Sequence, residues 1–212
     1  MNRYALLILA LFALVLIASC KKTVDNEPEP DYSTSYLPLA IGNTWTYIHN
    51  NDVKDLITAK VDGNTFFQGF QQFVSVSGTG YDGMYYLQYD NLYSMMVYPD
   101  VGPAFSTPIL DSYQPEGYSV VTKDSIAYSN DQTPPRSIMT IVQSGFSEAI
   151  NGKTYRNVIH TVVDVEEAFN GNYMNIKTYD FYFARGIGLI EIDQSNQGFV
   201  YDRLTIADYK IQ

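Results

Sequence analysis

The stretch Tyr36–Tyr47 reads YLPLAIGNTWTY and stands where a polar linker ends and a strand-like pattern begins. It contains the only tryptophan of the chain, Trp45. Gly42-Asn43 predicts a turn. The alternation that follows predicts a first strand, Trp45–His49, with Trp45, Tyr47 and His49 on one face. We expect this stretch to begin a β domain and Trp45 to be buried in its core.

The residues before this stretch predict an export signal. Asn2 and Arg3 form a short positive segment, and Tyr4–Ile17 is an uncharged apolar run. The run is shorter than the roughly 20 residues of a membrane-spanning helix and fits the hydrophobic region of a signal peptide. It ends Leu16-Ile17-Ala18-Ser19-Cys20, which resembles the lipobox of bacterial lipoproteins. The resemblance implies cleavage before Cys20 and lipidation, with acyl groups such as palmitate, at its thiol; an ordinary signal peptide is the alternative.

Cys20 is the only cysteine, so its lipidation would leave no thiol for catalysis, zinc binding or a disulfide. Several acyl chains would attach the protein to a membrane without spanning it. The lipobox resemblance also implies a Gram-negative bacterium. Lys21 stands where retention at the inner membrane usually needs Asp, which implies the outer membrane. The acidic residues of Lys21–Ser35 match the surface-export signals of Bacteroides-type lipoproteins only in part, so the leaflet stays open between periplasmic and cell-surface.

Three segments are expected along the chain. Residues 1–19 are the lipoprotein signal peptide, 20–35 a flexible acidic and proline-rich tether, and 36–212 a single all-β domain. Proline and self-repelling acidic side chains should keep the tether extended. Asp52–Lys60 also has a helical spacing, but we favour a strand there because no helical pattern of useful length lies nearby.

Residues 36–212 show strand patterns separated by short turns, such as Asn151-Gly152 and Asn170-Gly171. Asp62-Gly63-Asn64 predicts another turn, and Pro99–Pro115, with four prolines, predicts a long loop. This pattern predicts an all-β fold, a curved antiparallel sheet or partial barrel with largely meander connectivity. The predicted strands are Trp45–His49, Leu56–Val61, Gln71–Ser77, Met84–Asp90, Leu92–Tyr98, Tyr118–Val121, Ser125–Ser129, Ser137–Ser144, Asn157–Glu167, Asn175–Ala184, Leu189–Gln194 and Phe199–Tyr209.

Two stretches carry a family resemblance. YLPL followed by GNTWTY within 36–47, and YFARGIGLIE at 182–191, resemble the start and the end of a group of Bacteroides-type lipoproteins without an established activity. The group is similar to TapB-like domains and, more remotely, to the half-barrels of lipoprotein-localisation factors. The resemblance covers about a tenth of the chain and implies a curved antiparallel sheet in which Trp45, Gly186 and Gly188 are structural. It brings no catalytic residues.

Charge and composition narrow the function classes. The chain has 19 Tyr and 11 Phe, which favour strands. Its formal charge is −10; without residues 1–19, which hold only Arg3, 12 basic and 23 acidic residues leave −11. Such a surface repels phosphate backbones, so we do not expect nucleic-acid binding.

The sequence contains no recognisable catalytic or metal-binding motif. Its two histidines, His49 and His160, lack metal-ligand spacing, and no Gly-x-Ser-x-Gly elbow or phosphate-binding loop occurs. Glu166-Glu167 would point to opposite faces of a strand. We therefore expect both histidines to be structural and assign no catalytic residue, metal or cofactor.

The tyrosines between 81 and 98 are the remaining candidates for a binding surface. Some of them must face outward if the strands alternate, and exposed aromatic side chains bind sugars, peptides or partner proteins. Tyr81, Tyr86 and Tyr98 are the weak candidates for ligand binding. Cross-strand packing is the competing explanation and accounts for the same residues.

Three functions are compatible with the sequence. The leading hypothesis is a non-catalytic, membrane-anchored envelope lipoprotein that binds an envelope protein, glycan or lipid or serves a structural role. The second is a carrier of lipid or another apolar ligand in a half-barrel cavity. The third, an envelope hydrolase, requires His49 or His160 in a polar cleft within hydrogen-bond reach of a carboxylate.

Overall fold

The computed structural model describes residues 34–67, 71–78, 81–97, 105–123 and 133–212. The chain separates into two units, Met1–Pro30 and Asp31–Gln212, and every described residue belongs to the second. The expected signal peptide and most of the expected tether, including Cys20, therefore lie outside the described residues. Within the described ranges, no helix has the length and hydrophobicity needed to cross a membrane.

The described residues form twelve strands and no regular helix. The strands are β1 (Thr44–His49), β2 (Asp52–Phe67), β3 (Gln71–Gly78), β4 (Tyr81–Tyr89), β5 (Leu92–Val97), β6 (Phe105–Asp111), β7 (Ser119–Lys123), β8 (Arg136–Ile150), β9 (Lys153–Phe169), β10 (Asn172–Ala184), β11 (Gly188–Asn196) and β12 (Phe199–Lys210).

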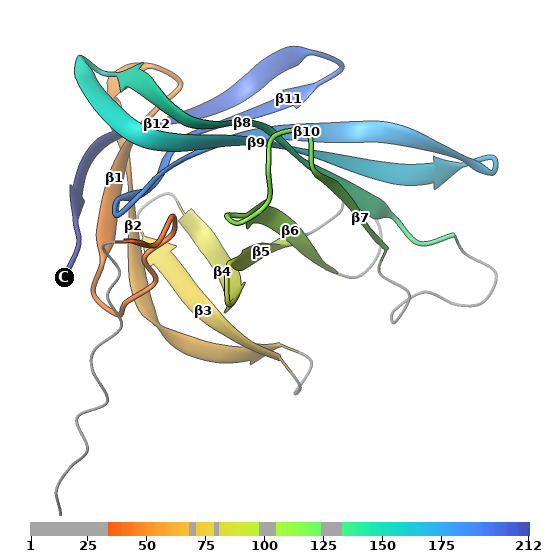
Figure 1. Cartoon of the computed structure of the whole chain (residues 1–212), viewed down its shortest axis with the longest axis horizontal. Helices are drawn as coiled ribbons and strands as arrows, with labels where there is room; N and C mark the ends of the chain where they lie inside the picture. Colours follow the sequence, from red (N-terminus) through yellow and green to blue (C-terminus); the bar gives the residue numbers. More distant parts are fainter. Residues whose placement is uncertain (1–33, 68–70, 79–80, 98–104, 124–132) are drawn as a thin grey trace, which may run out of the picture. The chain divides into compact units, whose positions relative to one another are not determined.

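All twelve strands belong to one antiparallel sheet in the order β6-β5-β4-β3-β2-β1-β12-β11-β10-β9-β8-β7. Strands that follow one another in sequence pair with each other, except β6 with β7. Because β1 also pairs with β12, the chain follows a circular meander that is open between β6 and β7. Figure 1 shows how strongly the sheet curls. The predicted all-β, curved meander is confirmed.

The two edges of the sheet meet by packing instead of by strand pairing. β6 lies against β8 and β9. Thr161 Oγ1 on β9 donates a hydrogen bond of 2.6 Å to the carbonyl of Ile109 on β6, and the hydroxyls of Thr107 and Ser137 are also hydrogen-bonded. These contacts occupy part of the β6 edge and leave the sheet a nearly closed barrel.

Two local predictions are wrong, for physical reasons. Phe105–Asp111 was expected to be part of a loop but forms β6. A proline is tolerated in this strand because β6 pairs with β5 alone and the register shifts beside Pro108. The expected turn at Asp62-Gly63-Asn64 lies inside β2, where the register shift between Val61 and Gly63 marks a bulge.

Most of the predicted hairpin turns are confirmed. Asn151-Gly152 and Asn170-Gly171 have φ of 50° and 77°, and of 50° and 79°, the positive values that a tight two-residue hairpin turn requires. The predicted strand Ser125–Ser129 lies outside the described residues.

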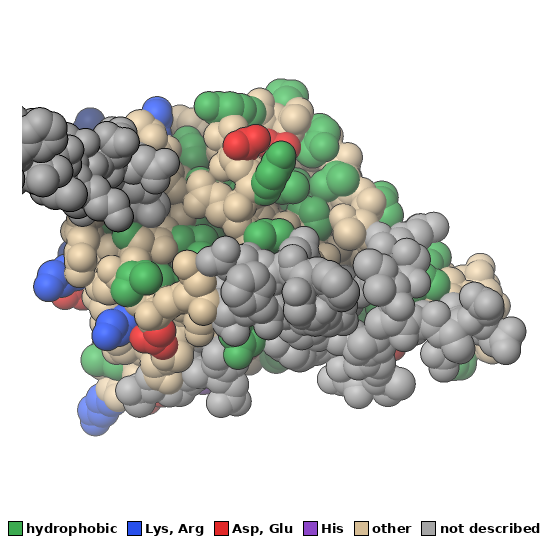
Figure 2. Space-filling view, turned by 90° about the horizontal axis from the view of Figure 1, so that it is seen from below, with side chains coloured by type: hydrophobic (Ala, Val, Ile, Leu, Met, Phe, Trp, Pro, Cys, Tyr) green, Lys and Arg blue, Asp and Glu red, His purple; other side chains and the backbone are tan. Residues whose placement is uncertain are grey.

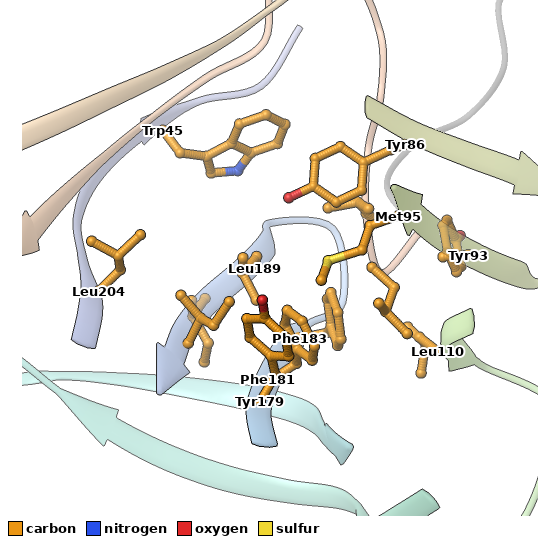
Figure 3. Close-up of a cluster of buried hydrophobic side chains, with 14 of the residues drawn as sticks. Trp45, Tyr86, Tyr93, Met95, Leu110, Tyr179, Phe181, Phe183, Leu189 and Leu204 are labelled. Atoms are coloured by element: carbon orange, nitrogen blue, oxygen red, sulfur yellow. The ribbon is translucent and has the colours of Figure 1, made fainter. Parts of the chain in front are cut away.

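The inner faces of the strands form one contiguous hydrophobic cluster. Its centre is a ladder on β10, in which the rings of Tyr179, Phe181 and Phe183 stack with centroids 5.6 and 5.8 Å apart. Figure 3 shows side chains of β4 and β5, among them Tyr86 and Met95, pointing toward this ladder from across the barrel. Opposite walls of the sheet are therefore in contact through side chains.

The strands run between two ends, named here after residues of β1. The Trp45 end carries the β10–β11 turn and the C-terminus, and the segment before β1 covers it. Trp45 is 3% exposed and its indole Nε1 donates to the carbonyl of Ile187 at 2.7 Å. A Cβ on Gly188, whose φ is +111°, would lie 3.0 Å from that indole nitrogen and 3.3 Å from Cδ of Pro38.

Asn43 fixes the same end from a second direction. Its side-chain amide donates to the carbonyl of Pro38 at 2.8 Å and accepts from the backbone amide of Gln212 at 3.0 Å. Its own carbonyl accepts from the amide of Val61 at 2.9 Å. The two stretches with the family resemblance therefore meet in space, and they form the cap of the barrel.

We expect Trp45→Ala to lower the free energy of unfolding by roughly 3–5 kcal/mol, as for other buried large aromatic residues. The loss combines a cavity with a carbonyl of Ile187 that has lost its donor. Chemical denaturation followed by circular dichroism measures it. An unchanged midpoint would mean that the cap does not stabilise the barrel.

Gly188→Ala should destabilise the domain by at least about 1 kcal/mol more than Gly152→Ala. Both glycines have positive φ, but a Cβ meets Trp45 and Pro38 at position 188 and meets nothing within 4 Å at position 152. The pair therefore separates packing from backbone strain. Equal melting temperatures of the two variants would contradict tight packing of Trp45 against Gly188.

Candidate functional site

Among the described residues, the His49 end carries the tips of three hairpins, β1–β2, β9–β10 and β11–β12. β3, β5 and β7 also end on this side, because a meander brings alternate strand ends together. The segment before β1 lies at the opposite, Trp45 end.

His49 connects two carboxylates at this end. Its Nδ1 lies 2.6 Å from Oδ2 of Asp55 on β2, and its Nε2 lies 2.8 Å from Oδ1 of Asp202 on β12. The hydrogen bond to Asp55 is the largest influence that raises the pKa of His49, and Asp202 adds to it. A doubly protonated imidazole would donate to both carboxylates and join β2, β1 and β12.

Next to this cluster, aromatic and amide side chains line the same end of the inner face. The register shift between Gln194 and Ser195 leaves Tyr201 as an extra residue on β12. The amide of Gln194 donates to the hydroxyl of Tyr201. Burial raises the pKa of Tyr179, so its phenol stays neutral, and Lys177 Nζ lies 5.9 Å from the centroid of its ring. We call His49, Asp55, Gln194, Tyr201 and Asp202 the His49 rim.

Large apolar side chains are exposed on all three hairpins of this end. They lie on the β1–β2, β9–β10 and β11–β12 hairpins and are Val53, Leu56, Phe169, Met174, Phe199, Val200 and Tyr201. Phe199 is 80% exposed. The face that is seen from below relative to Figure 1 also carries hydrophobic side chains over a broad area, and its visible Lys and Arg gather near the left edge (Figure 2). Phe199, Val200 and Tyr201 are consecutive, and a run of exposed apolar residues is typical of a contact surface.

The second histidine, His160, lies on the outer face of β9. Its ring stacks on Tyr182 with centroids 4.3 Å apart and an interplanar angle of 3°, and its Nε2 lies 2.8 Å from Oδ1 of Asp180. Both histidines thus have the carboxylate partner that the hydrolase hypothesis requires. In the part of the chain that the structure describes, however, neither is hydrogen-bonded to a serine, threonine or cysteine, and no group of acidic, His or Cys side chains could hold a metal ion.

The residues singled out from sequence are placed as follows. Tyr86 is 4% exposed and its hydroxyl donates to Sδ of Met84 at 3.0 Å inside the core. Tyr81 pairs through its backbone with Gly78, and its side chain lies outside the description. Cys20 and Tyr98 also lie outside it. Lipidation at Cys20 and ligand binding by Tyr81, Tyr86 and Tyr98 stay predictions.

Sequence reasoning did not find the His49 rim. It placed His49 on the same face as Trp45 and Tyr47, but its two acidic partners depend on a hairpin and on the pairing of β1 with β12. Asp202 is 153 positions away from His49 along the chain. No local pattern announces a contact of that kind.

No protein-family model matches the chain, and no curated protein matches it. Among solved structures, it is similar to a protein from Bacteroides fragilis described as exported and with a YmcC-like fold, at 10% identity and a TM-score of 0.46, over 84% of this chain and 100% of that chain. It is also similar to a protein from Parabacteroides distasonis described as a lipoprotein, at 12% identity and a TM-score of 0.44, over 84% of this chain and 99% of that one.

The His49 cluster should make stability depend on pH. Because the folded pKa of His49 is raised, its contribution is fully present below the ordinary pKa of about 6.5 and is lost as the pH rises through the folded value. For a partly exposed cluster we expect about 0.2–1 kcal/mol. Urea denaturation at pH 5.5 and pH 9 measures how much His49→Gln lowers the free energy of unfolding, and the loss should be larger at pH 5.5. With Asp55 and Asp202 both replaced by Asn, His49→Gln should have the same effect at both pH values.

Proposed function

We propose that this chain is a lipid-anchored envelope lipoprotein that binds a partner through its His49 end and carries out no reaction there. The resemblance of Leu16–Cys20 to a lipobox supports lipidation at Cys20. Lys21, which stands where an inner-membrane lipoprotein usually has Asp, supports the outer membrane.

The observation that supports binding at the His49 end is the placement of exposed apolar side chains opposite the attachment of the tether. The tether joins the barrel at the Trp45 end, where the amide of Gly186 donates to the carbonyl of Ser35 at 2.7 Å and Arg185 Nε donates to that of Thr34 at 3.3 Å. Phe199, Val200 and Tyr201 are exposed at the other end. Without a partner, these apolar side chains stay in contact with water, which is unfavourable, and covering them would stabilise a complex.

The tether is long enough to hold the barrel away from a bilayer. Residues 20–35, fully extended, span at most roughly 58 Å at 3.3–3.6 Å per residue. With the lipid at Cys20 and the barrel attached by its capped end, the His49 end would be accessible to envelope partners.

The chemistry of the His49 end favours a protein partner. Aromatic and aliphatic side chains around polar groups are the usual composition of the centre of a protein interface. Asp55 and Asp202 add acceptors that suit Lys or Arg side chains of the partner. A glycan is the second class of ligand that aromatic rings and carboxylates could bind.

The interior of the barrel does not favour the carrier alternative. Among the described residues, the inward side chains of both halves of the sheet belong to one buried cluster, with the Tyr179–Phe181–Phe183 ladder at its centre. A ligand inside would have to displace these side chains, at the cost of their mutual packing.

A photo-crosslinking amino acid tests the proposed binding end in the native host. We expect a discrete crosslinked product when it replaces Phe199 and none when it replaces Tyr113. The two positions are matched, since each is 80% exposed, but Tyr113 follows β6 at the Trp45 end. Equal crosslinking at both sites, or none at 199, would contradict binding through the His49 end. Mass spectrometry of the product would show whether a protein is attached.

Membrane attachment is tested separately by Cys20→Ala. Without the thiol no acyl group can be added, so the variant should lose incorporation of a clickable palmitate analogue and leave the membrane fraction. The wild type should keep both. A variant that stays with the membrane would show that another segment anchors the chain, without bearing on the partner-binding surface.

A further inference from the structure

The distal part of the β8–β9 hairpin, residues 144–157, bends away from the barrel wall and lies over the outer face of β10–β12. We call it the hairpin arm. Both of its strands are kinked at the same level: β8 has register shifts on either side of Phe146, and β9 has a positive φ of 52° at Asn157. Gly145 has a φ of 71°. Bulges and positive φ on both strands allow this sharp bend.

Two side chains near the tip attach the arm to β12, which it does not pair with. Asn151 Nδ2 donates to the carbonyl of Ile206 at 2.9 Å and to Oγ1 of Thr205 at 3.2 Å. Lys153 Nζ donates to the carbonyl of Ala207 at 3.1 Å. Figure 1 shows the tip of this hairpin beside β12. Apolar contacts add to these bonds: Ile150 and Tyr155 of the arm are buried, and the ring of Phe146 packs edge-to-face on Tyr182 of β10, with centroids 6.5 Å apart.

Beneath the arm lies an unusual group of polar residues for the outside of a barrel. On β11, Asp193 is buried and forms a two-pronged ion pair with Arg203 of β12. Glu191, two residues earlier, is 3.7 Å from the same guanidinium and has no closer cationic partner in the described part of the chain. Arg203 is therefore neutralised mainly by Asp193.

The charged groups that face Glu191 come from every strand packed around it. They are Asp193 on β11, Arg203 on β12, Glu148 on the arm, His160 on β9 and Tyr182 on β10, and Asp180 stands behind Tyr182 and His160. Burial raises the pKa of Tyr182 to about 12, so its phenol adds no charge near neutrality. Ionised Glu191 would therefore stand beside two like charges, one of them carried by the arm itself.

We propose that the hairpin arm is a pH-responsive strap, closed over β10–β12 when Glu191 is protonated and loosened when Glu191 and Glu148 are both ionised. Closing buries Ile150 and Tyr155 of the arm, and opening exposes them together with Thr205 beneath. The strap is separate from the His49 end, so it stands or fails independently of the proposed partner binding.

The direction of the response follows from linkage. Burial raises the pKa of Glu191 to about 7, and Asp193 adds to the rise. An open arm would remove Glu148 and part of the burial, and so would lower the pKa of Glu191 toward the ordinary value of about 4.3. The closed arm therefore binds the proton more tightly and loses stability, relative to the open arm, as the pH rises through the closed-state value of about 7. Above that value the ionised carboxylate disfavours closure by a constant amount.

Hydrogen exchange of the full chain, expressed as protection factors so that the intrinsic pH dependence cancels, measures the state of the arm. We expect protection of amides 148–155 to fall on the order of tenfold between pH 5.5 and pH 8. Glu191→Gln should keep the arm protected at both pH values. Glu167→Gln, a matched change on the same sheet at the end of β9 away from the arm, should behave like the wild type.

Two further variants complete the test. Asn151→Ala should expose the arm at both pH values, because it removes the bonds to Thr205 and Ile206. His160→Asn should leave the pH response in place. Constant protection of the wild type, a persistent response in Glu191→Gln, or loss of the response in His160→Asn would each overturn the proposal, as would an arm unaffected by Asn151→Ala.

Discussion

The hydrogen bond from the indole of Trp45 to the carbonyl of Ile187 is the contact on which the closed end of this barrel depends. It joins the first strand to the β10–β11 turn, 142 positions away, and it lies in the core, where an unpaired N–H would be costly. The contact requires Gly188, because a side chain there would collide with the indole and with Pro38. Tyr47 repeats the connection by donating to the carbonyl of Leu189 at 3.0 Å. One face of β1 thus holds the start and the end of the domain together.

A circular meander leaves two strand edges to be brought together, and the chain does so in different ways. β1 and β12 pair along their length, whereas β6 crosses onto β8 and β9 and contacts them through the hydroxyls of Thr107 and Thr161. Packing instead of pairing explains why β6 accepts Pro108. It also brings opposite walls into contact, so that among the described residues the inside serves for stability and the surfaces that remain for recognition are the rim and the outer face.

The outline of the fold could be predicted from sequence because it depends on local signals. Asn-Gly turns and period-two alternation mark the hairpins, and short hairpins in succession imply a meander. Features that depend on tertiary contacts could not be predicted. The strand containing Pro108 has a loop-like composition, the bulge at Gly63 reads as a turn, and the bend of the hairpin arm has no signal beyond Gly145. For the same reason His49 was recognised as part of a strand but not as the partner of Asp55 and Asp202, which long-range pairing brings to it.

The two ends of the barrel differ in chemistry, and this difference gives the domain a direction. At the Trp45 end, the side chains of Trp45, Tyr47 and Asn43 are buried and donate hydrogen bonds to backbone carbonyls. The His49 end has titratable groups and apolar side chains in contact with water. A tether that joins at the first end leaves the second free, so an anchored barrel of this kind would meet its partner with the surface that gains most from being covered. The arm lies on neither end, and the acidic side chains of β11 beneath it are the groups that would make the outer face respond to pH.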